Sequence, residues 1–127
     1  MRTKFLLLFS CIASLLISHN AWSHHSTANY DHSAKVLVEG TVTKFKWTNP
    51  HSWLYVSVPT EGGGEEEWAI ECGSVAQLLQ NDWARDDIQP GDHVRIVAWI
   101  ARDGTRHGEM HSIVTDDNKT LLNSVGY

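Results

Sequence analysis

The sequence has 127 residues with 15 acidic and 10 basic side chains, which gives a formal net charge of −5 at neutral pH. Without residues 1–23, which have the pattern of a signal peptide, the remaining 127 − 23 = 104 residues would carry a charge of 8 − 15 = −7. This length fits one small domain with one core. The negative charge argues against binding to nucleic acid or to anionic membranes, because both rely on Lys and Arg to neutralise phosphate.

The first 23 residues are expected to direct export. Basic residues stand at the start, an apolar stretch covers residues 5–17, and Ala21-Trp22-Ser23 places small residues three and one positions before a cleavage point. The apolar stretch is too short to cross a membrane, which takes roughly 20 residues. We therefore predict a periplasmic or secreted protein of residues 24–127 that begins His24-His25-Ser26 and has no membrane association after cleavage.

The first strand is predicted over residues 35–47, after a polar entry over residues 30–33. The segment is rich in Val, Thr and Phe, as strands are. Its apolar residues change from even to odd positions between Val38 and Phe45, and Gly40 lies close to the change. We therefore expect a β-bulge beside Gly40 that lets one long strand bend between two sheets.

Shorter strands follow, separated by turn signals. Between the third and fourth strands, the segment 74–77 (Ser-Val-Ala-Gln) has the capping-box pattern and predicts a short helix that ends near Asn81. This order predicts an all-β domain with one short helix, a five-stranded OB-like small β-barrel. A generic antiparallel barrel is the alternative. Alternation predicts the remaining strands over 53–58, 66–72, 93–101 and 109–115, with a terminal pairing at 121–122.

The first candidate site is the predicted mature N-terminus. An N-terminal histidine offers an imidazole nitrogen and an α-amine from one residue, and Cu(II) favours nitrogen ligands. One further imidazole would give His24 the three-nitrogen arrangement called a histidine brace, and His25 is another candidate ligand. Cleavage after Ala21 would instead place His24 third, which also chelates copper. The alternative is a disordered terminus without function.

The second candidate is the turn from Trp47 to Trp53. Its Asn-Pro pair predicts a constrained loop that holds His51 between two tryptophans. His51 is the favoured partner of His24 on copper, and Trp47, Asn49 and Trp53 are candidates for contact with a ligand or partner protein. The alternative is that the tryptophans cap the barrel end and His51 bonds a carbonyl.

A third candidate lies in the last main strand. His107, Glu109 and His111 would share one face of a strand and suit zinc or copper, although a solvated polar face is the favoured interpretation. Glu71 faces away from the core, where it is either solvated or holds a metal-binding histidine in one tautomer. Cys72 is expected to be a small buried side chain.

These motifs resemble those of a family of small, secreted, uncharacterised bacterial domains. The resemblance covers most of residues 24–120 and implies the fold and the export, but no activity. Cys72 departs from the aliphatic residue expected there. The motifs are His-His-Ser at 24–26, Gly-Thr-Val at 40–42, Trp-x-Asn-Pro-His-x-Trp at 47–53, Trp-x-x-Glu at 68–71 and Gly-Asp at 91–92.

The sequence thus favours an exported copper-binding protein rather than an enzyme, with a metal ion and another periplasmic protein as candidate partners. Neither a serine-nucleophile elbow nor a phosphate-binding glycine loop is present in the sequence. Two alternatives remain open. One is a module that binds a non-metal ligand or a protein through the aromatic barrel end of Trp47, Trp53 and Trp99. The other is a copper-dependent redox enzyme.

Overall fold

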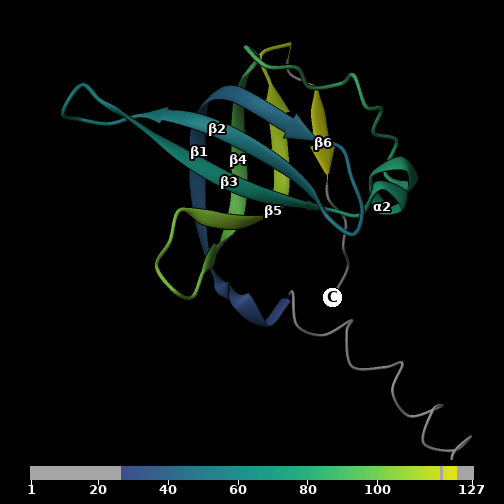
Figure 1. Ribbon diagram of the computed structural model, residues 1–127, viewed down its shortest axis with the longest axis horizontal. Coiled ribbons are helices and arrows are strands. Elements are labelled where there is room, and N and C mark those ends of the chain that lie inside the picture. The colour runs from purple at the N-terminus through teal and green to yellow at the C-terminus, as the bar shows by residue number, and fades with distance from the viewer. Residues whose placement is uncertain (1–26, 118, 123–127) are drawn as a thin grey trace, which may run out of the picture.

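The computed structural model describes residues 27–117 and 119–122, so His24, His25 and the predicted signal peptide lie outside the described residues. No helix in the described part of the chain is long and apolar enough to cross a membrane. The elements, in chain order (Figure 1), are η1 (Thr27–Asn29), β1 (Tyr30–Lys46), β2 (Ser52–Pro59), β3 (Glu65–Gly73), α2 (Val75–Gln80), β4 (His93–Ala101), β5 (His107–Thr115) and β6 (Thr120–Leu122).

Five strands close into a ring. Their order is β3-β2-β1-β4-β5, and the short β6 pairs with the outer edge of β5. The pairings are antiparallel except for β3 with β5, which run parallel and close the ring where Ala69–Glu71 meets His107–Glu109. The 17-residue β1 pairs with β4 through its first part and with β2 through its second. This connectivity confirms the predicted OB-like fold with one short helix.

The first strand begins earlier than predicted. Strand β1 starts at Tyr30, so the expected polar entry over residues 30–33 is part of the sheet. Its register with β2 shifts between Val42 and Lys44, which places the bulge beyond Gly40. Buried side chains keep to even positions as far as Val42, and the bulge then brings the odd-numbered Phe45 against the core.

Gly40 has a different role from the predicted one. A Cβ atom at this position would lie 2.1 Å from the carbonyl oxygen of Ser57 in β2. No side chain fits at that distance, so glycine allows the two backbones to approach. The bend of β1 therefore depends on two separate features, the close contact at Gly40 and the bulge after Val42.

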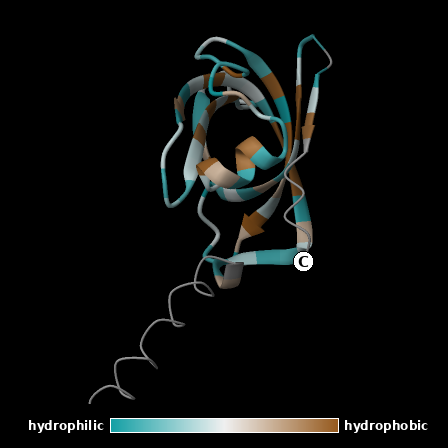
Figure 2. Cartoon of the chain, turned by 90° about the vertical axis from the view of Figure 1, so that its right-hand side faces the viewer, coloured by the Kyte–Doolittle hydropathy of each residue, from teal (hydrophilic) through white to brown (hydrophobic). Residues whose placement is uncertain are grey.

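The core fills the ring and one of its ends. Helix α2 lies across the open end in Figure 2 and contributes the buried Leu78. Its capping box is formed, because Ser74 Oγ accepts from the Gln77 amide at 3.2 Å and the Ser74 amide donates to Gln77 Oε1 at 2.8 Å. Cys72 is fully buried, as predicted. Other core residues are Val38, Val42, Leu54, Val56, Ile70, Trp83, Ile88, Val94, Ile96, Ala98, Met110 and Ile113.

Candidate functional site

One row of side chains crosses four strands on the outside of the ring. Trp53 of β2 pairs with Glu71 of β3, and Glu71 pairs with Glu109 of β5. Glu109 in turn pairs with Trp99 of β4. We call these four residues the outer row. It places two carboxylates side by side between two tryptophans. The outward direction follows from strand alternation, since the core holds their sequence neighbours Leu54, Ile70, Ala98 and Met110.

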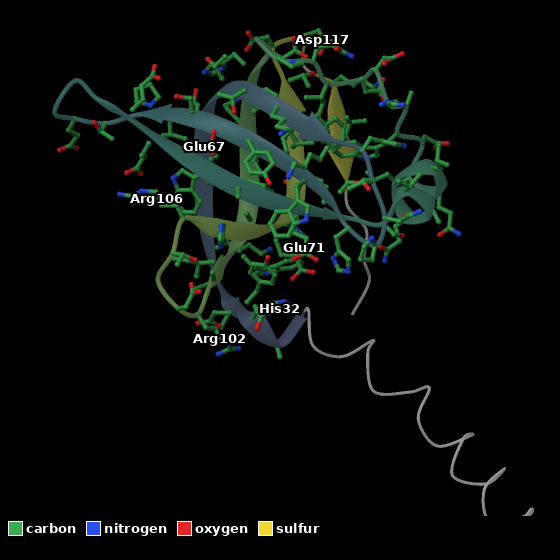
Figure 3. The ribbon with its side chains drawn as sticks, in the orientation of Figure 1. His32, Glu67, Glu71, Arg102, Arg106 and Asp117 are labelled. Atoms are coloured by element: carbon green, nitrogen blue, oxygen red, sulfur yellow. The ribbon has the colours of Figure 1, made fainter. Side chains whose placement is uncertain are left out.

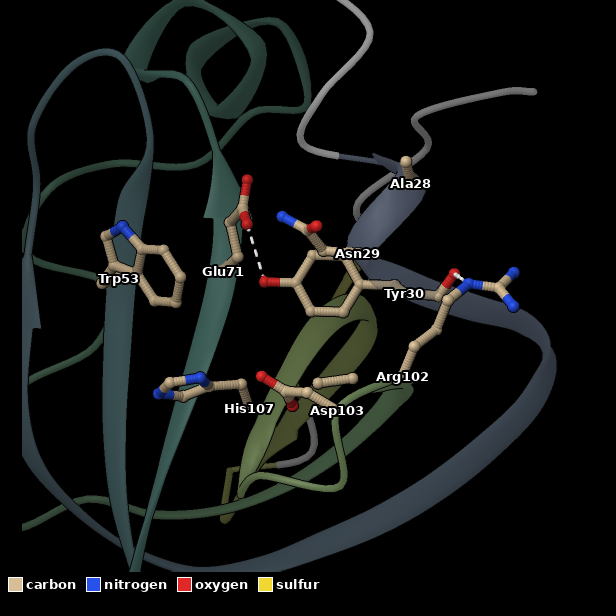
Figure 4. A pocket seen from close by; sticks show the side chains of 9 residues that line it. Ala28, Asn29, Tyr30, Trp53, Glu71, Arg102, Asp103 and His107 are labelled. Carbon is tan, nitrogen blue, oxygen red and sulfur yellow. Dashed lines mark hydrogen bonds between the residues drawn. The ribbon is translucent and has the colours of Figure 1, made fainter.

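Glu71 is buried and engaged at both carboxylate oxygens. Its residue exposure is only 6%. The Tyr30 hydroxyl donates to Glu71 Oε2 at 2.7 Å (Figure 4). His51 Nδ1 is hydrogen-bonded to Glu71 Oε1. The expectation of a solvated Glu71 is therefore wrong. The alternative, a carboxylate that fixes one histidine tautomer, describes the geometry found.

Glu109 contacts a different histidine, His32, which comes from β1. His32 Nε2 lies 2.9 Å from Glu109 Oε2, and the His32 ring stacks on Trp99 with centroids 4.8 Å apart. Figure 3 shows His32 near the start of β1. Burial raises the pKa of Glu109, and the hydrogen bond from His32 opposes that rise. Glu109 is 8% exposed, so the solvated face expected here is not found.

Tyr30 covers the two carboxylates from the first position of β1. Burial raises the pKa of its hydroxyl, and the hydrogen bond to Glu71 raises it further. The charges of Glu71, Glu109 and Asp103 act in the same direction. The hydroxyl therefore stays a protonated donor at neutral pH, in a region of negative potential.

The turn that carries His51 is tied to the start of α2. It contains a cis peptide bond between Asn49 and Pro50. Asn49 Oδ1 accepts from the Val75 amide at 3.1 Å, which ties the turn to the start of α2. The His51 side chain is 35% exposed. Since Glu71 holds Nδ1, the Nε2 atom of His51 is the nitrogen available to a metal.

The three tryptophans predicted to form one aromatic end lie in different places. Trp47 packs edge-on to Phe45, with centroids 5.7 Å apart, and contacts the core. Trp53 and Trp99 stand at opposite ends of the outer row. The single aromatic end is therefore a wrong prediction, because the bulge in β1 turns Trp47 towards the core. Asn49 stabilises the fold at this turn through its bond to α2.

His107, Glu109 and His111 alternate with the buried Gly108 and Met110 and so share the outer face of β5, as predicted. The register of β4 with β5 shifts between Val97 and Ala98, beyond Met110. His107 lies beside Trp53, with centroids 6.2 Å apart, and His111 lies 5.0 Å from Trp99. Among residues 27–117 and 119–122, no three or more His, Cys, Asp or Glu side chains form a group able to hold a metal ion.

A cavity of about 400 Å³ opens beside the outer row, where β1 begins (Figure 4). Sequence reasoning missed Tyr30 of the cavity and His32 beside Glu109, because both stood in the segment taken for a polar entry. Their spacing of two residues in a polar segment next to a long strand is the signal that they share a strand face. The lining includes Ala28, Tyr30, Trp53, Glu71, Asp103 and His107.

Comparison with known proteins gives a family and a fold. Residues 12–110 match a family model described as a family of unknown function (DUF6152). No curated protein matches the chain in sequence. The mitochondrial single-stranded DNA binding protein Rim1 from S. cerevisiae is structurally similar, with a TM-score of 0.51 and 15% identity over 68% of this chain and 96% of Rim1. At that identity the likeness extends to the OB-like fold alone.

Proposed function

Since this chain belongs to a family of unknown function (DUF6152), we propose from its own residues that it is an exported protein that binds copper through His24 and His51. Cleavage after Ser23 would make His24 the first residue, and its α-amine and imidazole would supply two nitrogens. His51 Nε2 would supply the third. Three nitrogens suit Cu(II), which prefers nitrogen ligands in a planar arrangement.

The observation that carries this proposal is the chain of contacts from Tyr30 through Glu71 to His51. Histidines that bind metals usually donate their other ring nitrogen to a carboxylate or carbonyl, which fixes the tautomer and raises the basicity of the ligating nitrogen. Glu71 is in that position, since it engages His51 Nδ1. Tyr30 in turn holds the second oxygen of Glu71. His51 therefore has the carboxylate contact that is typical of metal-binding histidines.

Chain length also supports a contribution from His24. Ala28 lines the same cavity as Glu71 and lies four residues after His24. An extended chain covers at most about 3.6 Å per residue, so the two Cα atoms are within about 14 Å. His51 also contacts Glu71, so this chain length allows His24 to reach the surroundings of the same carboxylate.

The test begins with the N-terminus of the exported protein, determined by mass spectrometry. Cu(II) titration and electron paramagnetic resonance spectra then compare the wild type with His24→Ala and His51→Ala. Each variant should lose at least about tenfold in affinity and lose nitrogen hyperfine structure. His93→Ala is the control, since His93 contacts Asp116 far along the chain from these residues. Unchanged affinity in both test variants, or a chain that starts neither at His24 nor at Trp22, would overturn the proposal.

A further inference from the structure

We propose that the cavity beside the outer row binds a small organic cation, a molecule that carries an ammonium group. The cavity volume of about 400 Å³ is in the range of small-molecule sites. The argument uses only described residues and needs no copper. It therefore stands or falls separately from the proposed metal site, although Glu71 borders both.

The walls of the cavity combine aromatic rings with carboxylates. Figure 4 shows Trp53 on one side and the Tyr30 ring on the other, with Glu71 and Asp103 at the two remaining sides. A cation over the face of a tryptophan is attracted by the ring quadrupole, and the attraction grows when water is excluded. Carboxylates that line the same cavity add a direct charge interaction with the cation.

Asp103 contributes a carboxylate that is held in place by hydrogen bonds within its own turn. Its Oδ1 accepts from the Thr105 amide at 3.0 Å and from the Thr105 hydroxyl at 2.6 Å. These hydrogen bonds lower the pKa of Asp103, so the group is ionised at neutral pH. The Thr105 hydroxyl also lies 3.2 Å from His107 Nδ1. Thr105 therefore contacts two lining residues of the cavity, Asp103 and His107.

The lining contains two basic side chains, Arg102 and His107, and Arg102 is directed away from the cavity. Its Nε donates to the carbonyl oxygen of Tyr30 at 3.0 Å. In Figure 4 its guanidinium group lies beyond Tyr30, away from Trp53 and Glu71. Apart from His107, the ionisable groups of the lining that face the cavity are the carboxylates of Glu71 and Asp103, which disfavour anions. Neutral molecules would gain contact with the rings but no charge interaction.

A quaternary ammonium compound is the sharpest probe, because it carries the charge without a nitrogen lone pair and cannot ligate copper. Calorimetry would compare choline with its neutral carbon isostere, dimethylbutanol, on the purified protein in a metal chelator. Choline should bind at least about tenfold more tightly than the isostere. In nuclear magnetic resonance spectra, the indole N–H signal of Trp53 should shift with saturation, while that of Trp47 should not.

Two substitutions locate the binding. Trp53→Leu and Asp103→Asn should each weaken choline binding by about tenfold. Asp116→Asn removes the same charge at a loop outside the cavity and should leave the affinity unchanged. Asp103 lies in an exposed turn, so Asp103→Asn remains informative if Trp53→Leu fails to fold. Equal binding of the isostere, an absence of saturable binding, or unchanged affinity in Asp103→Asn would overturn the proposal.

Discussion

His51 and His93 each contact a carboxylate, and their surroundings differ in nearly every other respect. The Glu71 side chain beside His51 is 8% exposed and is also bonded by Tyr30. The Asp116 side chain beside His93 is 76% exposed, at a distance of 3.2 Å from His93. Exposed ion pairs contribute little, because water and salt screen them. A buried carboxylate, by contrast, requires its partners. Burial of the acid, rather than its proximity to a histidine, distinguishes a prepared site from a surface contact.

The loops around His93 show that acidic residues and a cavity are not sufficient. A cavity of about 330 Å³ there is lined by four aspartates, among them Asp87 and Asp92. Their oxygens are used in contacts within and between the surrounding loops. Asp87 pairs with Lys119, and Asp92 accepts a hydrogen bond from the Gln89 amide at 2.7 Å. Among the described residues, the side chains that line this cavity include no Trp, Tyr or Phe. These carboxylates stabilise turns, whereas Glu71 and Glu109 orient side chains.

The largest effect on stability and copper affinity is expected from Glu71→Gln, at the buried histidine–carboxylate contact. This change keeps the shape of the side chain but removes the charge and one acceptor that His51 and Tyr30 use. We expect a loss of about 1–3 kcal/mol in the free energy of unfolding, measured in urea. Cu(II) affinity should fall by about tenfold or more. An unchanged stability would mean that the burial of Glu71 has no energetic consequence and would remove the contrast with Asp116.

Alkaline unfolding gives a second test of burial. Because burial raises the pKa of Tyr30 above its ordinary value of 10.0, the folded state keeps the proton to higher pH than the unfolded state. The stability that depends on this proton is complete below pH 10.0 and is lost as the pH rises above it. The slope contributed is at most about 1.4 kcal/mol per pH unit. Urea unfolding at increasing pH should show a shallower loss for Tyr30→Phe, and equal slopes would contradict the assignment.

At neutral pH the same variant has a smaller effect. Tyr30→Phe keeps the ring that covers the carboxylates and removes only the hydroxyl that donates to Glu71. We expect a loss of about 1 kcal/mol in the free energy of unfolding. In the double variant with Glu71→Gln the losses should not add, since both changes remove one contact. Full additivity would show that the two side chains act independently.

The smallest effect is expected at the exposed pair. Asp116→Asn should change the free energy of unfolding by less than about 0.5 kcal/mol, and added salt should reduce even this difference. Cu(II) affinity should not change. A loss comparable to that of Glu71→Gln would mean that exposure does not separate the two histidine–carboxylate contacts.

Much of the fold was predictable because it depends on local signals. Alternation predicted the strand from His93 to Ala101 with the bounds observed, and the capping box at Ser74 predicted α2. The bulge was placed near Gly40 because glycine often marks one. The glycine is instead required by the close approach of the Ser57 carbonyl oxygen on the neighbouring strand β2. This contact cannot be predicted from the sequence of β1.

The candidate site was less predictable, because its partners come from different strands. His51 stood out from the Asn-Pro turn, but its bond to Glu71 depends on the register of β2 with β3. Likewise, Glu109 was grouped with His107 and His111 by spacing along one strand. These histidines instead contact the tryptophans at the two ends of the outer row, and the histidine that contacts Glu109 comes from β1. Local patterns predicted which residues were candidates for a functional site, but not which of them lie in contact.

The parallel pairing of β3 with β5 also has a kinetic consequence. Glu71 and Glu109 become neighbours only through this pairing, and they lie about forty positions apart in the chain. Contacts of such separation carry a high entropic cost and form late in folding. During synthesis Glu71 emerges well before its neighbour. A partly folded chain would thus contain His51 without the complete carboxylate pair behind it, so the capacity to bind a ligand at this face would arise only when the ring closes.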